Sequence, residues 1–560
     1  MTSAAPQTYR EVERKLRVHG LYRLPDLTAA SADEPAAVAQ VREQSTLELT
    51  ATYYDTGDLR LARSHVTLRR RSGGVDDGWH LKLPADDLAG ADPRSGGGSD
   101  GAAVRDEVRL PLDDAVVPPP ELLRIVLGVT RGADVEPVAT LRTERRPYEL
   151  VGPDGRLLAE LTDDTVSVLD GTHVAARFRE LEVENRDGAP DEIAAVVAAL
   201  VGSGAVEGGL PSKAVRALGP AAMAPPDVAP PSSLAPVGPH DPAGAAIRAH
   251  VVRNTSAFLA QDLRVRRGLP DSVHQMRVAA RRLRSGLKVF APLVDEAWAT
   301  ELRDELSWIA AELGHLRDRE VLEERLLDDL AALPAGDPGT GDHEAGHGRA
   351  GVDHTDRRDI AAAADVVRRT FDAERPAAQA GLDAAMSSDR YLALLALLVA
   401  AAREPELTEA ATRPAAQELP PLLAKAWRRL SRDAERLRLD GTDDSWHETR
   451  IAAKRARYAA EALAPVFGRP ARKLAKSLEQ VTELLGEHQD AVIAAKTARE
   501  LAAGRRVTGT TGFVLGLLHE AERAAVVTAR TQFMRVWPEI SEAGGPSGPA
   551  GLAGLAKVRG

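Results

Sequence analysis

Residues 9 to 218 are constrained most by a strict alternation of charged and apolar side chains within short segments. In YREVERKLRV, Glu11, Glu13 and Lys15 share one face of an extended strand, and mostly apolar residues share the other. Same-face neighbours lie about 6.6 Å apart, and two carboxylates at that separation repel by roughly 2.5 kcal/mol at an effective dielectric of about 20. Each such strand therefore needs solvent or counter-charges on its charged face.

The same parity recurs in TLRRR, WHLKL and FRELEVEN, which are separated by turn residues. An open sheet would expose the charged faces and pack the apolar faces on helices. A closed antiparallel barrel with flanking helices satisfies both faces, because the apolar faces pack outward while the charged faces line a wet lumen. The predicted inward bases are Lys15, Arg69, Arg71, Lys82 and Arg145, and the predicted inward acids are Glu11, Glu13, Glu160, Asp164, Glu180 and Glu182.

This mixture of charges is the set that phosphoryl transfer needs. Arginine and lysine clamp phosphate oxygens, while clustered carboxylates hold a hard cation such as Mg²⁺ or Mn²⁺ that orients an attacking water. The chain has no cysteine, which excludes disulfides, thiolate metal sites and cysteine nucleophiles. A metal ion would have to bind oxygen or histidine.

A change of pattern marks the domain boundary. After a Pro- and Ala-rich stretch, nearly every segment carries Ala, Leu, Arg and Glu at helical spacing, which predicts an all-α domain. Gly-rich insertions near 89–103 and 334–353 are expected to be mobile loops. The predicted parts are a tunnel domain at 7–219, a linker at 220–240, a helical domain at 241–540 and a disordered tail at 541–560.

The helical half contains an internal repeat. HQMRVAARRLR at 274–284 returns as HETRIAAKRAR at 447–457, and ELGHLRDREV returns as LLGEHQDAVI. The spacing from His274 to Asp318 is 44 residues and that from His447 to Asp490 is 43, so the two motifs of each copy recur in register. We therefore predict two duplicated helical bundles, at about 241–400 and 415–540.

Each repeat carries one basic stripe at helical spacing. A run of charge on a helix is usually a solvated face, but like charges four residues apart cost a few tenths of a kcal/mol without an anionic partner. The duplication also brings two stripes into one molecule, which suits a long polyanion. The histidines are candidate phosphate donors, with metal ligation as the alternative. The predicted set is His274, Arg277, Arg281, Arg284, Lys288, His447, Arg450, Lys454 and Arg457.

The charge and composition of the whole chain limit the kinds of partner and the cellular location that we expect for it. The net charge is −11 and the isoelectric point is near 5.8, which argues against bulk binding of nucleic acid. The start of the chain has no apolar core of signal-peptide length, and the longest apolar run, YLALLALLVAAA, is too short to span a bilayer. We therefore expect a cytoplasmic protein without a membrane partner.

Six motifs in order resemble the CYTH superfamily of triphosphate tunnel metalloenzymes: ExExK, YYDTGDLRLARSHVTLRRR, GWHLKLP, LRTERRPYEL, FRELEVE and LPSKAVRAL. The resemblance implies metal ligands at Glu11, Glu13, Glu180 and Glu182, helped by Glu160 and Asp164. It implies phosphate contacts at Lys15, Arg69, Arg71, Lys82, Arg145 and Lys213, with Arg142 and Arg146 as alternatives to Arg145. Glu11, Glu13, Lys15 and Lys82 are the implied catalytic set, acting on a water that attacks a terminal phosphoryl group.

Residues from about 240 to 540 resemble the CHAD domain, a helical module associated with inorganic polyphosphate. The second copy departs from the pattern, because it has HQD where the first has LRD. Together the two resemblances imply a metal-dependent hydrolase of inorganic triphosphate or polyphosphate that docks on polyphosphate, in the cytoplasm or on polyphosphate granules. The alternatives are a non-catalytic polyphosphate-binding protein and, less favoured, an adenylyl cyclase.

Overall fold

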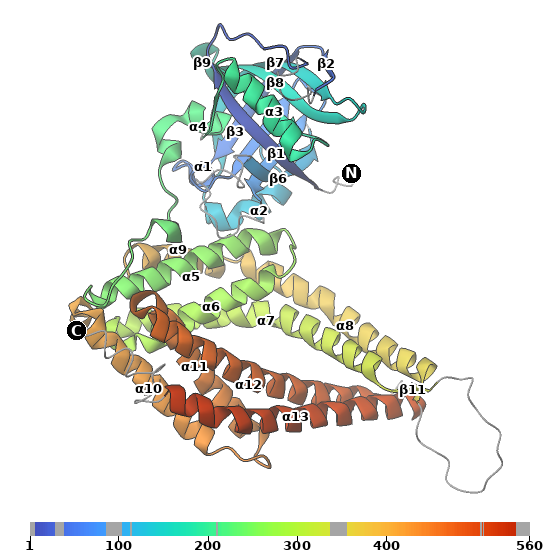
Figure 1. Cartoon of the computed structure of the whole chain (residues 1–560), viewed down its shortest axis with the longest axis vertical. Helices are drawn as coiled ribbons and strands as arrows, with labels where there is room; N and C mark the ends of the chain where they lie inside the picture. Colours follow the sequence, from blue (N-terminus) through green and yellow to red (C-terminus); the bar gives the residue numbers. More distant parts are fainter. Residues whose placement is uncertain are drawn as a thin grey trace, which may run out of the picture. The chain divides into compact units, whose positions relative to one another are not determined.

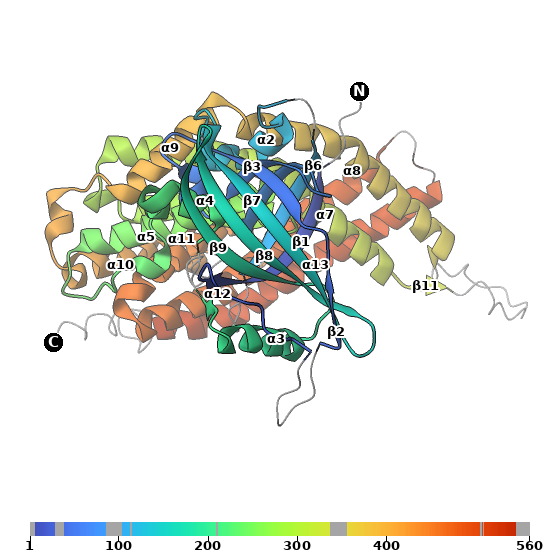
Figure 2. The same cartoon turned by 90° about the horizontal axis from the view of Figure 1, so that it is seen from above.

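The structure is a computed structural model that describes residues 6–28, 38–85, 103–112, 115–208, 211–336, 355–504, 507 and 509–544. The main division between two compact units falls after Ser232, and Figures 1 and 2 show both units. The predicted insertions at 89–103 and 334–353 lie almost wholly outside the described residues, as does most of the tail predicted at 541–560.

Antiparallel strands of the first unit close into a barrel (Figure 1). The described ring runs β1, β6, β5, β4, β3, β7, β8 and β9, and pairing of β9 with β1 closes it. The strands are β1 (Gln7–Val18), β2 (Gln40–Glu43), β3 (Leu47–Asp55), β4 (Thr67–Ser72), β5 (Gly78–Pro84), β6 (Ala103–Pro111), β7 (Glu136–Val151), β8 (Leu157–Asp170), β9 (His173–Asn185) and β10 (Val206–Glu207). The prediction of a closed barrel is confirmed.

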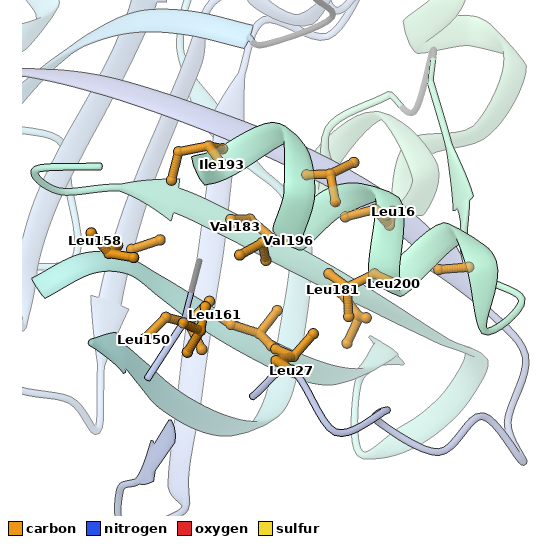
Figure 3. Close-up of a cluster of buried hydrophobic side chains, with 14 of the residues drawn as sticks. Leu16, Leu27, Leu150, Leu158, Leu161, Leu181, Val183, Ile193, Val196 and Leu200 are labelled. Carbon is orange, nitrogen blue, oxygen red and sulfur yellow. The ribbon is translucent and has the colours of Figure 1, made fainter. Parts of the chain in front are cut away.

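Packing of helices on the outer face explains why the alternation yields a barrel. The helices are α1 (Arg60–Arg63), α2 (Pro120–Thr130), α3 (Pro190–Gly202) and α4 (Lys213–Leu218). Ile193, Val196 and Leu200 of α3 pack on Leu16 and Leu181 of the sheet (Figure 3). Burial of each such aliphatic side chain contributes about 1.5–3 kcal/mol, so the apolar faces turn outward and the charged faces are left to the lumen.

The segment predicted as an extended linker contains two short 3-10 helices, Gly219–Met223 and Pro231–Ser233. Between them, Asp227 pairs with Arg63 at 2.7 Å and with Arg131. The first part of this segment is therefore fixed to the barrel rather than free.

The second unit is all-helical, as predicted. Two residue pairs, β11 (Ala335–Gly336) and β12 (Thr355–Asp356), form a short parallel bridge. No single helix in the described ranges is long and apolar enough to cross a bilayer, although the helices Arg357–Met386 and Asp389–Arg403, bent by 56° at their junction, pass such a test together. The helices are α5 (Ala243–Arg266), α6 (Ser272–Val289), α7 (Glu296–Ala332), α8 (Arg357–Met386), α9 (Asp389–Arg403), α10 (Ala415–Glu435), α11 (Asp443–Phe467), α12 (Arg469–Ala502) and α13 (Gly509–Gly544), with 3-10 turns at Ala291–Leu293 and Glu409–Thr412.

The repeated motifs fall on equivalent helices of this unit. The first copy places them on α6 and α7, and the second places them on α11 and α12. Helix α6 packs against α7, α11 packs against α12, and α6 also packs against α11 (Figure 1). The two basic stripes therefore lie on neighbouring helices.

Candidate functional site

The barrel encloses a cavity of about 540 Å³ that is lined mainly by charged side chains. Tyr53 is the single aromatic residue among the described lining residues. The lining also includes Lys213, which the resemblance implied as a phosphate contact, and most of the predicted inward set: Glu11, Glu13, Lys15, Arg69, Arg71, Lys82, Arg145, Glu160 and Glu182. The structure thus brings these residues together around one lumen.

Lys15 lies between acids of two adjacent strands. Its Nζ is 3.1 Å from Glu13 and 2.9 Å from Glu182, which is its register partner on β9. Burial opposes the ammonium charge, but these two carboxylates outweigh burial and raise the pKa of Lys15. Lys15 is therefore a fixed positive charge at neutral pH.

Lys213 at the start of α4 reaches a buried group of acids. Its Nζ is 2.9 Å from Asp164, 3.0 Å from Glu180 and 2.7 Å from Glu182. Asp164 and Glu180 are fully buried, and neither lines the cavity described above. Burial works against ionisation of Asp164, but Lys213 and Arg145 overcome it and lower the pKa of that carboxyl. The predicted metal ligands Asp164 and Glu180 thus have bases as their partners.

Arg145 rather than Arg142 or Arg146 faces the lumen. Its guanidinium binds Asp164 through two hydrogen bonds, of 2.9 and 2.7 Å, and binds Glu182 at 3.1 Å. Arg142 and Arg146 have the opposite parity on β7 and are exposed, and Arg146 pairs with Glu144. Of the three arginines considered for this position, Arg145 is the one that lines the cavity.

On the opposite wall, Lys82 donates to both oxygens of Glu11, at 2.8 and 2.6 Å. Burial raises the pKa of Glu11, but the Lys82 ammonium outweighs burial, and the net shift is downward. The Nε atoms of Arg69 and Arg71 are buried and have no hydrogen-bond partner among the described residues. A buried unsatisfied donor is costly, so these two guanidiniums are suited to an anion that enters the lumen.

Glu107 on β6 is a member of the site that the sequence analysis missed. It accepts from His80 at 3.0 Å and from Arg109 at 2.6 Å, and Arg69 lies 3.7 Å away. Burial lowers the pKa of His80 to about 4. The signal was present in VRDEVRL, where Arg105, Glu107 and Arg109 alternate with other residues, but the analysis did not sort that strand by face.

A row of acids crosses three adjacent strands. Glu13 faces Glu184 in the register of β1 with β9, and Glu184 faces Glu160 in the register of β9 with β8. Burial raises the pKa of Glu184, and the carboxylates of Glu11 and Glu160 add to that shift. Like charges directly opposite each other are destabilising, so this row is chemically suited to a cation.

The donor type fits a hard divalent ion such as Mg²⁺ or Mn²⁺, which prefers oxygen ligands. In the described part of the chain, however, no three acidic or histidine side chains surround one point at ligand distances. The acids are paired with bases instead, such as Glu160 with Arg186 at 2.9 Å. Glu184, which the sequence analysis left out of the ligand set, belongs to the same row.

In the helical unit, most of the predicted stripe residues gather between α6 and α11, and we call them the basic cluster: His274, Arg277, Arg281, Arg284, Lys288, Arg450 and Lys454. Burial lowers the pKa of Lys454 to about 7, and Arg450 and Arg281 contribute to the shift. Arg281 belongs to α6 and Lys454 to α11, so the two stripes act on one region. The Nε atoms of Arg281 and Arg450 are buried without a hydrogen-bond partner among described residues.

Acids fix part of this cluster. Arg277 donates to Asp318 at 2.5 Å, and Arg450 lies 3.9 Å from Asp490, in the equivalent position of the second copy. His447 donates from Nδ1 to the side-chain oxygen of Gln489 at 2.7 Å.

Two other residues depart from the expected arrangement. Arg457 was predicted to belong to the stripe, but its guanidinium binds Glu461 at 2.7 Å and Glu479 at 2.5 Å, so local acids occupy it. In the second copy Gln489 stands where the first has Arg317, and the neighbouring base, His488, is buried and stacked on Trp446. It therefore adds no base to the surface.

Comparison with known proteins finds two matching family models, a CYTH domain over residues 9–203 and a CHAD domain over residues 249–499. The uncharacterized protein Rv2226 of Mycobacterium tuberculosis is 32% identical over 569 aligned residues, covering 96% of this chain and 98% of the relative. Two solved structures are 26% identical to this chain. PptA from Streptomyces chartreusis covers 53% of this chain and 100% of its own, with a TM-score of 0.43. The CHAD domain from the plant Ricinus communis covers 54% and 95%, with a TM-score of 0.40.

Proposed function

Because the chain belongs to the family in which a CYTH domain is followed by a CHAD domain, we propose that its tunnel hydrolyses inorganic triphosphate or polyphosphate and that its helical domain binds polyphosphate. CYTH superfamily members are typically triphosphate tunnel hydrolases or cyclases and generally use divalent metal ions. For this protein we propose in addition that the substrate is inorganic, that the reaction is hydrolysis, and that the metal ion is Mg²⁺ or Mn²⁺.

The observation that carries the proposal is the closed lumen with bases and acids on facing walls. Lys15, Lys82 and Arg145 each hold a carboxylate partner within 3.1 Å. A phosphate chain offers the same kind of acceptor at higher charge, so it can replace these partners one by one. Tyr53 as the single aromatic among the described lining residues favours an inorganic chain over a nucleotide, because little surface is available for stacking a base.

The residues of the chain then divide into two roles. Six bases hold the phosphoryl oxygens and align the phosphate chain with the attacking water. These bases are Lys15, Arg69, Arg71, Lys82, Arg145 and Lys213. Glu11, Glu13, Glu182 and Glu184 would hold the divalent ion, which supplies charge neutralisation and orients that water. Direct attack of the positioned water on the terminal phosphoryl group transfers that group to water without a covalent intermediate.

The basic cluster of the helical domain supports the second half of the proposal. Its unsatisfied Arg281 and Arg450 donors and its few acids suit a ligand recognised by charge density rather than by base edges. Fourteen residues separate His274 from Lys288 on α6, which corresponds to about 21 Å at 1.5 Å per residue. A stripe of that length suits an extended polyanion.

The test is a phosphate-release assay on the full chain with tripolyphosphate, long-chain polyphosphate, thiamine triphosphate and ATP, each with Mg²⁺ or Mn²⁺. We expect release from the inorganic substrates and a loss of at least about 100-fold in Glu11→Gln and Glu13→Gln, with binding of long-chain polyphosphate retained. An absence of phosphate release in wild type would favour a polyphosphate-binding protein without activity. A cyclic product from ATP would favour the cyclase.

A further inference from the structure

The turn between β4 and β5 places an acid at the cavity. Val75 and Asp76 of this turn line the lumen together with Arg71 of β4. The Asp76 carboxylate pairs with the Arg71 guanidinium, and its side chain keeps 29% of its surface exposed while that of Arg71 keeps 7%. Asp76 thus comes from the rim of the lumen, whereas Arg71 belongs to the wall.

A glycine that no other residue could replace and two hydrogen bonds shape the turn. Gly73 has φ +98°, and a Cβ at this position would lie 2.1 Å from the carbonyl oxygen of Glu48 on β3. The backbone N–H of Gly74 donates to Asp77 at 2.7 Å, and His80 Nε2 lies 2.9 Å from the carbonyl oxygen of Asp76. The position of the Asp76 carboxylate is therefore set by the fold of the turn and not by Arg71 alone.

Arg71 differs from the other lumen bases in its partners. Lys15, Lys82 and Arg145 are paired with acids of the barrel strands themselves. Among described residues, Arg71 has an ion pair only with Asp76, and its Nε is buried without a hydrogen bond. Burial lowers the pKa of Arg71 to about 9, and the neighbouring guanidiniums of Arg69 and Arg145 add to the shift. The Glu107 carboxylate opposes this shift but lies beyond ion-pair distance of Arg71, so Asp76 is the one ion-pair partner of Arg71 in the described residues.

We propose that Asp76 is an internal counter-ion, which pairs with Arg71 when no substrate is bound and is displaced when a phosphoryl group binds Arg71. Asp76 thereby sets the affinity of the tunnel for its substrate. The inference rests on the proposed binding of phosphate in the lumen. It adds a specificity-determining residue outside the barrel strands, in the turn between β4 and β5.

Removal of the competing charge should tighten binding without changing the chemical step. Asp76→Asn keeps the size of the side chain and removes the charge, so we expect the KM for tripolyphosphate to fall by roughly five- to thirtyfold. The value of kcat should stay within about twofold, because Asp76 contacts neither a predicted metal ligand nor the catalytic lysines. Asp76→Glu restores the charge and should return KM toward wild type.

Asp77→Asn is the matched control, because Asp77 is the adjacent exposed acid, it contacts Gly74 rather than Arg71, and an asparagine Oδ1 still accepts the hydrogen bond from Gly74 that holds the turn. It makes the same change in net charge and should leave KM within about twofold. Direct binding of tripolyphosphate in EDTA, measured by titration calorimetry on the full chain, should rank the three variants in the same order. A general effect of charge would instead move Asp76→Asn and Asp77→Asn together.

The outcomes separate the inference from the function on which it rests. If wild type releases phosphate from tripolyphosphate but Asp76→Asn has an equal or higher KM, Asp76 positions Arg71 and the counter-ion role is overturned. If wild type neither binds nor hydrolyses tripolyphosphate, the proposed function fails, and this inference fails with it. Tighter binding in Asp76→Asn alone supports both.

Discussion

Replacing Lys213 by Met tests whether the buried charges of the barrel act as one coupled group. Lys213 contacts Asp164, Glu180 and Glu182 within 3.0 Å. Removal of one partner from a buried ion pair costs about 3–5 kcal/mol. In Lys213→Met each of these acids still has another basic partner, such as Arg145 for Asp164. We therefore expect the free energy of unfolding to fall by about 3 kcal/mol, near the lower end of that range.

The loss should depend on pH in a defined direction. The pKa values of Asp164 and Glu182 are lowered in the folded protein despite burial, by Lys213 with Arg145 and by Lys15 with Lys213, respectively. Their contribution to stability is therefore present above the unfolded pKa of about 4 and is lost as pH falls through the folded value. In Lys213→Met the folded pKa values rise, so the destabilisation is largest near pH 7 and shrinks on acidification.

Hydrogen exchange read by mass spectrometry on the full chain measures this locally, in peptides from β8 and β9. Arg142→Met removes an exposed base from the same barrel and should change the local free energy of opening by less than about 0.5 kcal/mol. A loss below about 1 kcal/mol for Lys213→Met at pH 7, or a loss that does not vary with pH, would refute the coupling described above.

Two further predictions concern other parts of the chain. Burial, together with Arg450 and Arg281, lowers the pKa of Lys454 to about 7, so binding of long-chain polyphosphate should take up a proton and should weaken as pH rises from 6.5 to 8.5. Calorimetry in two buffers of different ionisation enthalpy should detect the proton uptake, and Lys454→Arg should remove it. Equal heats in both buffers would contradict this view of the basic cluster. Leu181→Ala should reduce the local stability of β9 by about 2–5 kcal/mol, whereas Val174→Ala, at a position that is 43% exposed, should change it by less than about 0.5 kcal/mol; similar effects of the two would argue against the outer packing on α3.

Alternation along single strands was enough to predict the barrel and most of its lumen. Glu11, Lys15 and Lys82 face inward because parity leaves their strands only two faces, and one of these must be apolar to bury Leu16 and its neighbours. Parity also separated Arg145 from Arg142 and Arg146 once the register of β7 was known. The fold class followed from these local patterns.

Pairing across strands and turns could not be predicted in the same way. Asp164 and Glu180 share the predicted parity and are register partners across β8 and β9, but they are fully buried against Lys213 and do not line the cavity. Arg457 keeps the helical spacing of its stripe, yet Glu461 on the same helix and Glu479 on the next occupy it. Asp76 lies in a turn, where no periodicity applies. Which acid pairs with which base depends on distances in the folded structure, and the spacing of residues along the sequence does not give these distances.

The most direct measurement is anomalous diffraction from a crystal of the full chain grown with Mn²⁺ and tripolyphosphate. The account predicts a manganese peak inside the barrel beside the carboxylates of β1 and β9, with phosphate density against Lys15, Lys82 and Arg145. Manganese and phosphate on the outer surface, with every lumen ion pair still intact, would contradict it.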